Sequence, residues 1–348
     1  ASYSPLGDWI YVAMLGSETV DVLDAYSFES VGSYAGLGHG VDALWAAPSG
    51  DRLWVLASLS RELILVSLEG GEGELARLDL RPGGLEVLAP EVLLGKQVFH
   101  RAADPRMSLD GYLSCASCHL EGSEDGRVWD FTDRGEGLRN TLTLQGSAGT
   151  GFGPIHWSGN FDEVQDFEND IRTSFAGAGF LSETDWDVAS EPLGEPKAGR
   201  SVELDALASY LGTLTAVPDS PYREADGSFS PEALAGEILF ESPTLGCISC
   251  HPPPDYTDSQ WLPDGSPLLH DVGTIGPGSG GRSGGKLAGL DTPSLRGLWA
   301  TPPYLHDGSA ATLGDVLTSA NPEDLHGTTS QLSEAELARL IAFLMQLE

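Results

Sequence analysis

The chain has few basic residues, few cysteines and no long apolar run. Its 348 residues include 18 Lys and Arg against 52 Asp and Glu, a formal net charge of −34. Such a surface repels phosphate backbones and anionic lipids, which argues against nucleic-acid binding. A basic redox partner, a divalent cation, a salty habitat or general solubility would each account for the acidic excess. The longest apolar run, residues 337–347, is broken by polar side chains and is too short to cross a bilayer, so we expect no membrane span.

All four cysteines lie in two pentapeptides, so none remains for a structural disulfide. The pentapeptides are Cys115-Ala116-Ser117-Cys118-His119 and Cys247-Ile248-Ser249-Cys250-His251. Zinc binding by two Cys-x-x-Cys pairs, or a redox disulfide, would not require a histidine directly after each pair.

A c-type haem does require that histidine, because the two thiols hold the porphyrin and the adjacent imidazole binds the iron. The sequence therefore predicts two covalently bound haem c groups, with His119 and His251 as iron ligands. Haem attachment of this kind occurs outside the cytoplasm, so we expect a periplasmic or extracellular protein.

Residues 1–83 are predicted to form antiparallel β-structure. Short β-branched and aromatic runs at residues 9–13, 19–24, 51–56 and 62–68 are separated by turn residues. Residues 4–9 match residues 47–52, a spacing of 43 residues that is typical of a β-propeller blade, and the blades resemble the YVTN type. Two blades cannot close a propeller of about 4–8 blades. We therefore expect either that the sequence is part of a longer chain or that the open strand edges pair with another subunit, in a homo-oligomer or another assembly.

The segments 84–218 and 219–348 share one order of elements. Each has a short helix, a Cys-x-x-Cys-His pentapeptide, long loops and a closing amphipathic helix, at residues 202–214 in the first and from Ser333 in the second. The predicted fold class is therefore mixed. Two mainly α cytochrome c-like haem domains, residues 84–218 and 219–348, follow a β-propeller-like antiparallel β-segment of about two blades, residues 1–83.

Further motifs surround the pentapeptides. They are LGKQVF at residues 94–99, DPRMS at 104–108, RNT at 139–141, TPSLR at 292–296 and TPPYLHDG at 301–308. With these motifs, residues 91–348 resemble the bacterial dihaem cytochrome c peroxidases and their MauG-like relatives. The resemblance implies a dihaem scaffold that either passes electrons, reduces hydrogen peroxide or oxidises a protein substrate. It also allows a calcium site, for which Arg106 and the acidic groups around Asp271 are candidates.

The resemblance also implies roles for five further residues. Trp157 falls where the family has a tryptophan between the haems, and His306 where it has a histidine near the propionates of the second haem. Arg139, Arg296 and Tyr304 are candidates for propionate contacts. Ordinary packing or surface ion pairs are the alternative for all five.

The chain departs from the family at the distal side of the second haem. The family places a methionine or tyrosine shortly after the motif that contains His306, but residues 313–321 contain neither. The resemblance and this gap together favour His326 as the distal ligand. Met345 is the competitor, although it lies on the closing helix.

The first haem shows a second departure. Family peroxidases carry an acidic residue in the distal pocket for proton transfer, and the corresponding position here is Gly177. Nearby carboxylates, Glu163, Asp166 and Glu168, are out of register. His156 is either a distal ligand, which would close the site, or a histidine packed beside Trp157.

The spare histidines and the missing acid favour electron transfer by two low-spin haems. The alternative is an enzyme, in which the first haem receives hydrogen peroxide or oxidises a protein substrate and the second haem admits electrons. In a third hypothesis, the β-segment docks a partner and the haems are secondary.

Overall fold

The computed structural model describes residues 1–69 and 73–348. Two compact units alternate along the chain. The first consists of Ala1–Ser117, Phe167–Asp187 and Ala198–Tyr210, and the second of Cys118–Asp166, Val188–Lys197 and Leu211–Glu348. Helices and antiparallel strands occur together, so the expected mixed fold is confirmed. The domain boundaries near residues 83 and 218 stay a prediction. Within the described ranges, no helix combines the length and hydropathy that a bilayer crossing requires.

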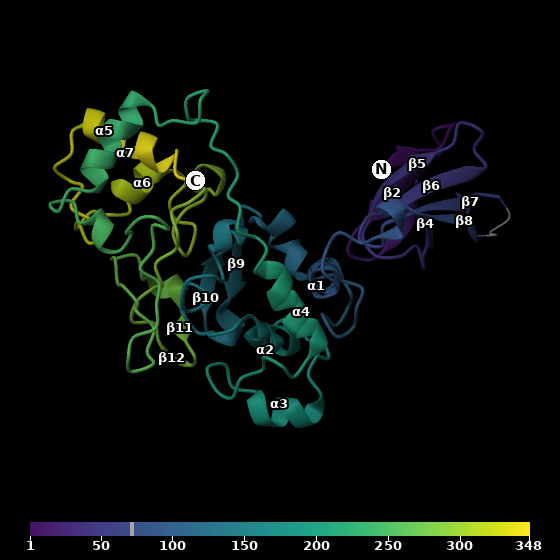
Figure 1. The fold of residues 1–348 in the computed structure, drawn as a ribbon, viewed down its shortest axis with the longest axis horizontal. Coiled ribbons are helices and arrows are strands. Elements are labelled where there is room, and N and C mark those ends of the chain that lie inside the picture. Colours follow the sequence, from purple (N-terminus) through teal and green to yellow (C-terminus); the bar gives the residue numbers. More distant parts are fainter. Residues whose placement is uncertain (70–72) are drawn as a thin grey trace. The chain divides into compact units, whose positions relative to one another are not determined.

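The first unit opens with two four-stranded antiparallel meanders, in the orders β1-β2-β3-β4 and β5-β6-β7-β8 (Figure 1). Alternating apolar residues on the facing sides, such as Val20, Leu53 and Ile64, form one buried cluster. This is the alternation that half-buried strands require. The strands are Ser2–Tyr3 (β1), Trp9–Met14 (β2), Thr19–Asp24 (β3), Ser30–Tyr34 (β4), Val41–Ala46 (β5), Arg52–Ala57 (β6), Glu62–Ser67 (β7) and Gly73–Asp79 (β8).

Four helices follow in chain order: Pro90–His100 (α1), Phe167–Thr173 (α2), Glu183–Ala189 (α3) and Val202–Leu211 (α4). Helix α4 begins after Ser201, whose hydroxyl accepts from the backbone N–H of Leu204 at 3.3 Å. Gly95 of α1 lies against α4, where an added Cβ would overlap the carbonyl oxygen of Ala206. The ring centres of Phe99 and Tyr210 are 5.3 Å apart across this helix pair.

The second unit contains Pro231–Phe240 (α5), Leu313–Leu317 (α6) and Glu334–Leu344 (α7), and the short strands Val128–Phe131 (β9), Gly137–Asn140 (β10), Gly281–Arg282 (β11) and Gly285–Lys286 (β12). Ser230 caps α5, and Ser333 and Glu336 form the predicted capping box of α7. Figure 1 shows α5 and α7 side by side.

The pair α5 and α7 repeats the packing of α1 and α4. Gly236 of α5 corresponds to Gly95. A Cβ added at Gly236 would overlap the carbonyl oxygen of Arg339 on the facing helix. The ring centres of Phe240 and Phe343 are again 5.3 Å apart. Both helix pairs therefore need a glycine at the crossing and an aromatic pair one turn away, which fits an internal duplication.

Candidate haem sites

The second pentapeptide opens onto a cavity of about 420 Å³ in the second unit. Cys247, Cys250, His251 and His326 all line it. The Nδ1 atom of His251 lies 2.9 Å from the carbonyl oxygen of Tyr256, so this nitrogen carries the proton and Nε2 keeps its lone pair. The residues therefore fit a haem that is held by two thiols and bound by the Nε2 atom of His251.

His326 lies opposite His251 in this cavity. The two ring centres are 6.4 Å apart and the ring planes are inclined by 41°. Burial lowers the pKa of His251 to about 4, and burial also lowers the pKa of His326. Both imidazoles are therefore neutral near pH 7, which is the form that binds metals.

Asn321 holds the loop that carries His326. Its side-chain oxygen accepts from the backbone N–H of His326 at 2.8 Å, and its amide nitrogen donates to the carbonyl oxygen of Gly327 at 2.8 Å and to Oγ1 of Thr329 at 3.0 Å. Asn321 is only 4% exposed. The sequence analysis did not single out this residue, although an asparagine before a proline signals a local turn.

Three of the residues predicted at the propionates line the same cavity: His306, Tyr304 and Arg296. His306 is fully buried, and its Nδ1 has no hydrogen-bond partner among the described residues. Its Nε2 lies 2.7 Å from the hydroxyl of Ser279. The Nε atom of Arg296 is likewise buried without a partner in the described chain. Such orphaned polar atoms fit a polar group of a bound molecule.

Arg139 lies close to His306, but its guanidinium has backbone partners. Its guanidinium donates to the carbonyl oxygens of Leu138 at 2.7 Å and Ser279 at 2.9 Å. Arg139 is not among the residues that line the cavity. Within the described chain, it holds the glycine-rich loop at residues 276–289 in place.

Trp157 and His306 occupy equivalent positions in two loops of the same shape. An isolated bridge closes each loop, between Ile155 and Phe161 and between Tyr304 and Ala310. Positive φ angles recur at matching positions, 71° at both His156 and Leu305, and 61° and 64° at Gly159 and Gly308. The loops run from Pro154 and from Pro303.

The rings of Trp157 and His306 meet edge to face, with centres 6.4 Å apart. Two contacts hold the tryptophan loop: its indole N–H donates to the carbonyl oxygen of Asn140 at 2.9 Å, and Arg282 donates to the carbonyl oxygens of Ser158 and Gly159. The structure thus brings together the tryptophan and the histidine that the sequence analysis had selected separately.

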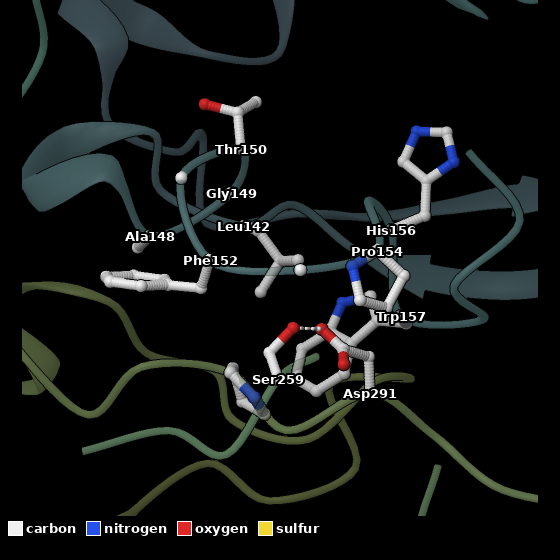
Figure 2. A pocket seen from close by; sticks show the side chains of 13 residues that line it. Leu142, Ala148, Gly149, Thr150, Phe152, Pro154, His156, Trp157, Ser259 and Asp291 are labelled. Atoms are coloured by element: carbon white, nitrogen blue, oxygen red, sulfur yellow. Dashed lines mark hydrogen bonds between the residues drawn. The ribbon is translucent and has the colours of Figure 1, made fainter. Parts of the chain in front are cut away.

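His156 lies near the proximal histidine of the first pentapeptide. Burial lowers the pKa of His119 to about 4, with a smaller contribution from the neighbouring His156. Figure 2 shows that the His156 imidazole points away from Ser259 and Asp291, which hydrogen-bond to each other on the other side of Trp157. His156 is thus directed away from Ser259 and Asp291, although it adjoins Trp157 in sequence.

Gly177, the position that corresponds to the distal acid of the family peroxidases, is tightly packed. A Cβ at Gly177 would overlap backbone oxygens of Arg106 and Met107. Glu168 accepts from two backbone N–H groups and from Arg172, and Asp166 pairs with the fully buried Lys197 at 2.6 Å. Glu163 accepts from the backbone N–H of Lys197. These three carboxylates are engaged in structural contacts.

The other candidates lie in ordinary surroundings. Met345 packs against the core between α5 and α7 and does not line the cavity. His39 pairs with Glu18 at 2.6 Å. Arg106 pairs with Asp104 and Glu203, so the calcium site remains a prediction.

Two further residues escaped the sequence analysis, because the contacts that matter join distant positions. Asn160 lies 2.8 Å from Nδ1 of His156, and Glu136 accepts a hydrogen bond from Asn160. Glu136 and Asn160 are 4% and 7% exposed. Only the matching of the loops from Pro154 and Pro303 would have drawn attention to position 160.

The fold and the two pentapeptides define a dihaem c-type cytochrome. Residues 89–197 match the family described as di-haem cytochrome c peroxidase, and residues 289–325 match a RoxA-like, cytochrome c-like family. The chain is 32% identical to the hydrazine synthase subunit gamma of Kuenenia stuttgartiensis, over 70% of this chain and 74% of that protein. It is 30% identical to the methylamine utilization protein MauG of Methylorubrum extorquens, over 75% and 79% of the two chains.

A solved structure of hydrazine synthase from Kuenenia stuttgartiensis matches 76% of this chain and 89% of that chain, with 29% identity and a TM-score of 0.56. The chain therefore belongs to the di-haem cytochrome c peroxidase/MauG family, and it carries two covalently bound c-type haems.

Proposed function

We propose that this protein transfers electrons through two six-coordinate haems outside the cytoplasm. The observation that carries the proposal is the separation of 6.4 Å between the ring centres of His251 and His326. Two metal–imidazole bonds of about 2 Å, with about 1 Å from each nitrogen to its ring centre, place two axial imidazoles about 6 Å apart. The pair is thus spaced for one iron atom, so the second haem would have no open position for peroxide.

The remaining residues of the second site have supporting roles in this proposal. Cys247 and Cys250 attach the porphyrin, and Tyr256 fixes the tautomer of His251. His306 and Arg296 present unpaired buried nitrogens to the cavity and bind the propionates, while Tyr304, whose hydroxyl donates to the carbonyl oxygen of Leu298, shapes its wall.

At the first site, Cys115 and Cys118 would attach the porphyrin, and His119 and His156 would bind the iron. The haems supply the reversible one-electron chemistry of iron. Trp157 adjoins His156 in sequence and contacts His306. Trp157 and His306 therefore provide the packed aromatic route between the two sites.

The experiment compares His326→Ala with Met345→Leu in the full haem-loaded protein. We expect His326→Ala to convert one of the two haems to a high-spin form that binds cyanide, and Met345→Leu to leave both spectra unchanged. Wild-type protein should exchange electrons with a soluble redox dye without consuming hydrogen peroxide. An unchanged spectrum of His326→Ala, or rapid peroxide consumption by the wild type, would reject the proposal.

The relatives favour a second candidate, an oxidoreductase that acts on peroxide or on a protein substrate. The matches to the relatives named MauG, cytochrome c551 peroxidase and hydrazine synthase subunit gamma extend over most of the length of those proteins. In that case the first haem has an open distal position and His156 serves as an acid–base group. Steady peroxide turnover after one-electron reduction would select this candidate.

A basic redox partner suits the net charge of −34. Opposite charges speed encounter at low ionic strength, and salt screens the attraction. Electron transfer to a basic cytochrome should therefore slow as salt is added, whereas transfer to a neutral dye should not.

The β-segment offers an apolar face for association with a second copy of the chain. The open edge strand β8 is protected by ion pairs of Arg77 with Glu62 and Glu74, so edge pairing is disfavoured. On one face of the second meander, apolar side chains lie opposite each other on neighbouring strands. Its other face packs on the first meander. The exposed face consists of Ala43, Trp45, Trp54, Leu56, Leu63, Leu65, Ala76 and Leu78.

Trp45 and Leu78 on this face are 53% and 56% exposed. Because the opposite face already binds a meander of the same kind, a meander from a second copy would continue the stacking. The double variant Trp45→Glu/Leu78→Glu should lower the molar mass measured by light scattering. A monomeric wild type at all concentrations would contradict this assembly.

A further inference from the structure

The surroundings of His156 suggest more than a packed side chain. Its Nδ1 atom lies 2.8 Å from Oδ1 of Asn160, and the amide nitrogen of Asn160 donates to Oε1 of Glu136. Phe161 packs on the imidazole, with ring centres 4.5 Å apart. The bridge between Ile155 and Phe161 closes the loop around this group. One imidazole is thus fixed by a hydrogen bond and by a ring contact.

The order of donors and acceptors follows from the chemistry of Glu136. Its carboxylate lies 3.3 Å from the guanidinium of Arg134 and 3.7 Å from that of Arg139. A carboxylate only accepts hydrogen bonds, so Asn160 must turn its amide nitrogen toward Glu136. The amide oxygen then faces His156, and it can only accept.

We infer that Glu136 and Asn160 are positioning residues that hold His156 with its proton on Nδ1, so that Nε2 presents its lone pair to the iron of the first haem. The inference rests on the proposed ligation by His156 and extends it to the residues that make this ligation possible. A polar partner on the far nitrogen fixes both the tautomer and the ring direction of a metal-bound histidine.

The second loop of the same shape lacks this device. Leu305 stands at the position of His156, and Ser309 at that of Asn160. The distal candidate of the second haem, His326, comes instead from another loop, and its Nδ1 has no hydrogen-bond partner among the described residues. The hydrogen-bonded pair of Glu136 and Asn160 therefore accompanies the loop that carries a histidine, as expected if the pair positions that histidine.

The test uses four variants of the full haem-loaded protein. Asn160→Leu removes both hydrogen bonds of the Asn160 side chain. In Glu136→Gln, the side chain at position 136 can donate as well as accept, so it no longer fixes the orientation of the Asn160 amide. Both variants should produce a high-spin fraction at the first haem and raise its midpoint potential. Cyanide should bind the first haem more tightly, by about the 10–100-fold that loss of such a partner typically costs in the affinity between a site and its metal. Ser309→Ala, at the matching position of the second loop, should change none of these quantities.

The double variant Glu136→Gln/Asn160→Asp exchanges the hydrogen-bond donor and acceptor between positions 136 and 160. The amide introduced at position 136 can donate to the carboxylate introduced at position 160. That carboxylate can accept from Nδ1 of His156, so the same tautomer is restored. We expect a low-spin first haem and weak cyanide binding, although each substitution changes the charge. A packing role would not produce this rescue, and the double variant gives an answer even if Asn160→Leu does not fold.

His156→Ala distinguishes iron binding by His156 from the positioning role of Glu136 and Asn160. If this variant leaves the first haem low-spin, His156 is not a ligand and the proposed function fails at this site. If it makes the first haem high-spin while Glu136→Gln, Asn160→Leu and the double variant all retain wild-type spectra and cyanide affinity, only the positioning role is wrong.

Discussion

The two haem-binding halves share a plan, but the histidines proposed as distal ligands are held in different ways. In the first half, His156 lies within the loop from Pro154 and is tied through Asn160 to the buried Glu136. In the second half, the equivalent loop carries Leu305, and His326 comes from a loop that Asn321 holds through backbone contacts. A duplicated scaffold therefore preserves helix packing and the proximal pentapeptides, whereas the distal side diverges between the copies.

The largest expected effect tests whether each pentapeptide attaches one haem. Cys115→Ser/Cys118→Ser and Cys247→Ser/Cys250→Ser should each lower the haem that resists acid–acetone extraction from two groups per chain to one, because serine forms no thioether. Mass spectrometry of the intact chain provides the count. A variant that retains two attached haems would remove the basis for comparing the halves.

The glycines at the two helix crossings should give similar, smaller effects. Gly95→Ala and Gly236→Ala each place a methyl group against a carbonyl oxygen of the facing helix. Overpacking of this kind costs about 1–3 kcal/mol in the free energy of unfolding. Urea unfolding of the haem-loaded protein measures it, with Glu91→Ala on the exposed side of α1 as the control. A loss at one crossing alone would argue against equivalent packing.

Asn321→Ala should affect the second half alone. The four hydrogen bonds by which the Asn321 side chain holds the loop of His326 are lost, at a cost of about 1–3 kcal/mol when buried partners remain unpaired. The second haem should gain a high-spin fraction in absorption spectra, while the first haem stays low-spin. Glu323→Ala, an exposed neighbour in the same loop, is the matched control. Equal changes at both haems would show that the distal loops are not independent.

A further prediction concerns the pH dependence of stability. Burial raises the pKa of Asp291 to about 7, and the nearby Asp258 adds to the rise. The folded state thus holds a proton that the unfolded chain, with an aspartate pKa of about 4, releases. The stabilisation is complete below about pH 4 and is lost as the pH rises toward 7. Asp291→Asn should flatten this part of the stability curve, and an unchanged slope would contradict the assignment.

Local patterns in the sequence were sufficient for much of the fold. The serine before Pro231 and the capping box at Ser333 lie where the structure has helix starts, and the runs at residues 19–24 and 62–68 correspond to β3 and β7. These signals depend on neighbours within a few residues, so they are readable without tertiary contacts. Helix α4 ends at Leu211, earlier than the predicted residue 214.

The parts that the sequence did not provide depend on contacts between distant residues. Glu136 and Asn160 are separated by 24 positions, and neither stands in a motif. The burial of Asp166 with Lys197 likewise joins residues 31 positions apart. Family resemblance selected Arg139 for a propionate contact, which stays a prediction. The backbone contacts of Arg139 with Ser279 could only be found from the fold.

Low-temperature electron paramagnetic resonance of the oxidised, haem-loaded full chain tests the central claim most directly. The account predicts two low-spin ferric signals that together integrate to two spins per chain, with near-infrared magnetic circular dichroism typical of paired imidazole ligands. A high-spin ferric signal that accounts for one whole haem would contradict it.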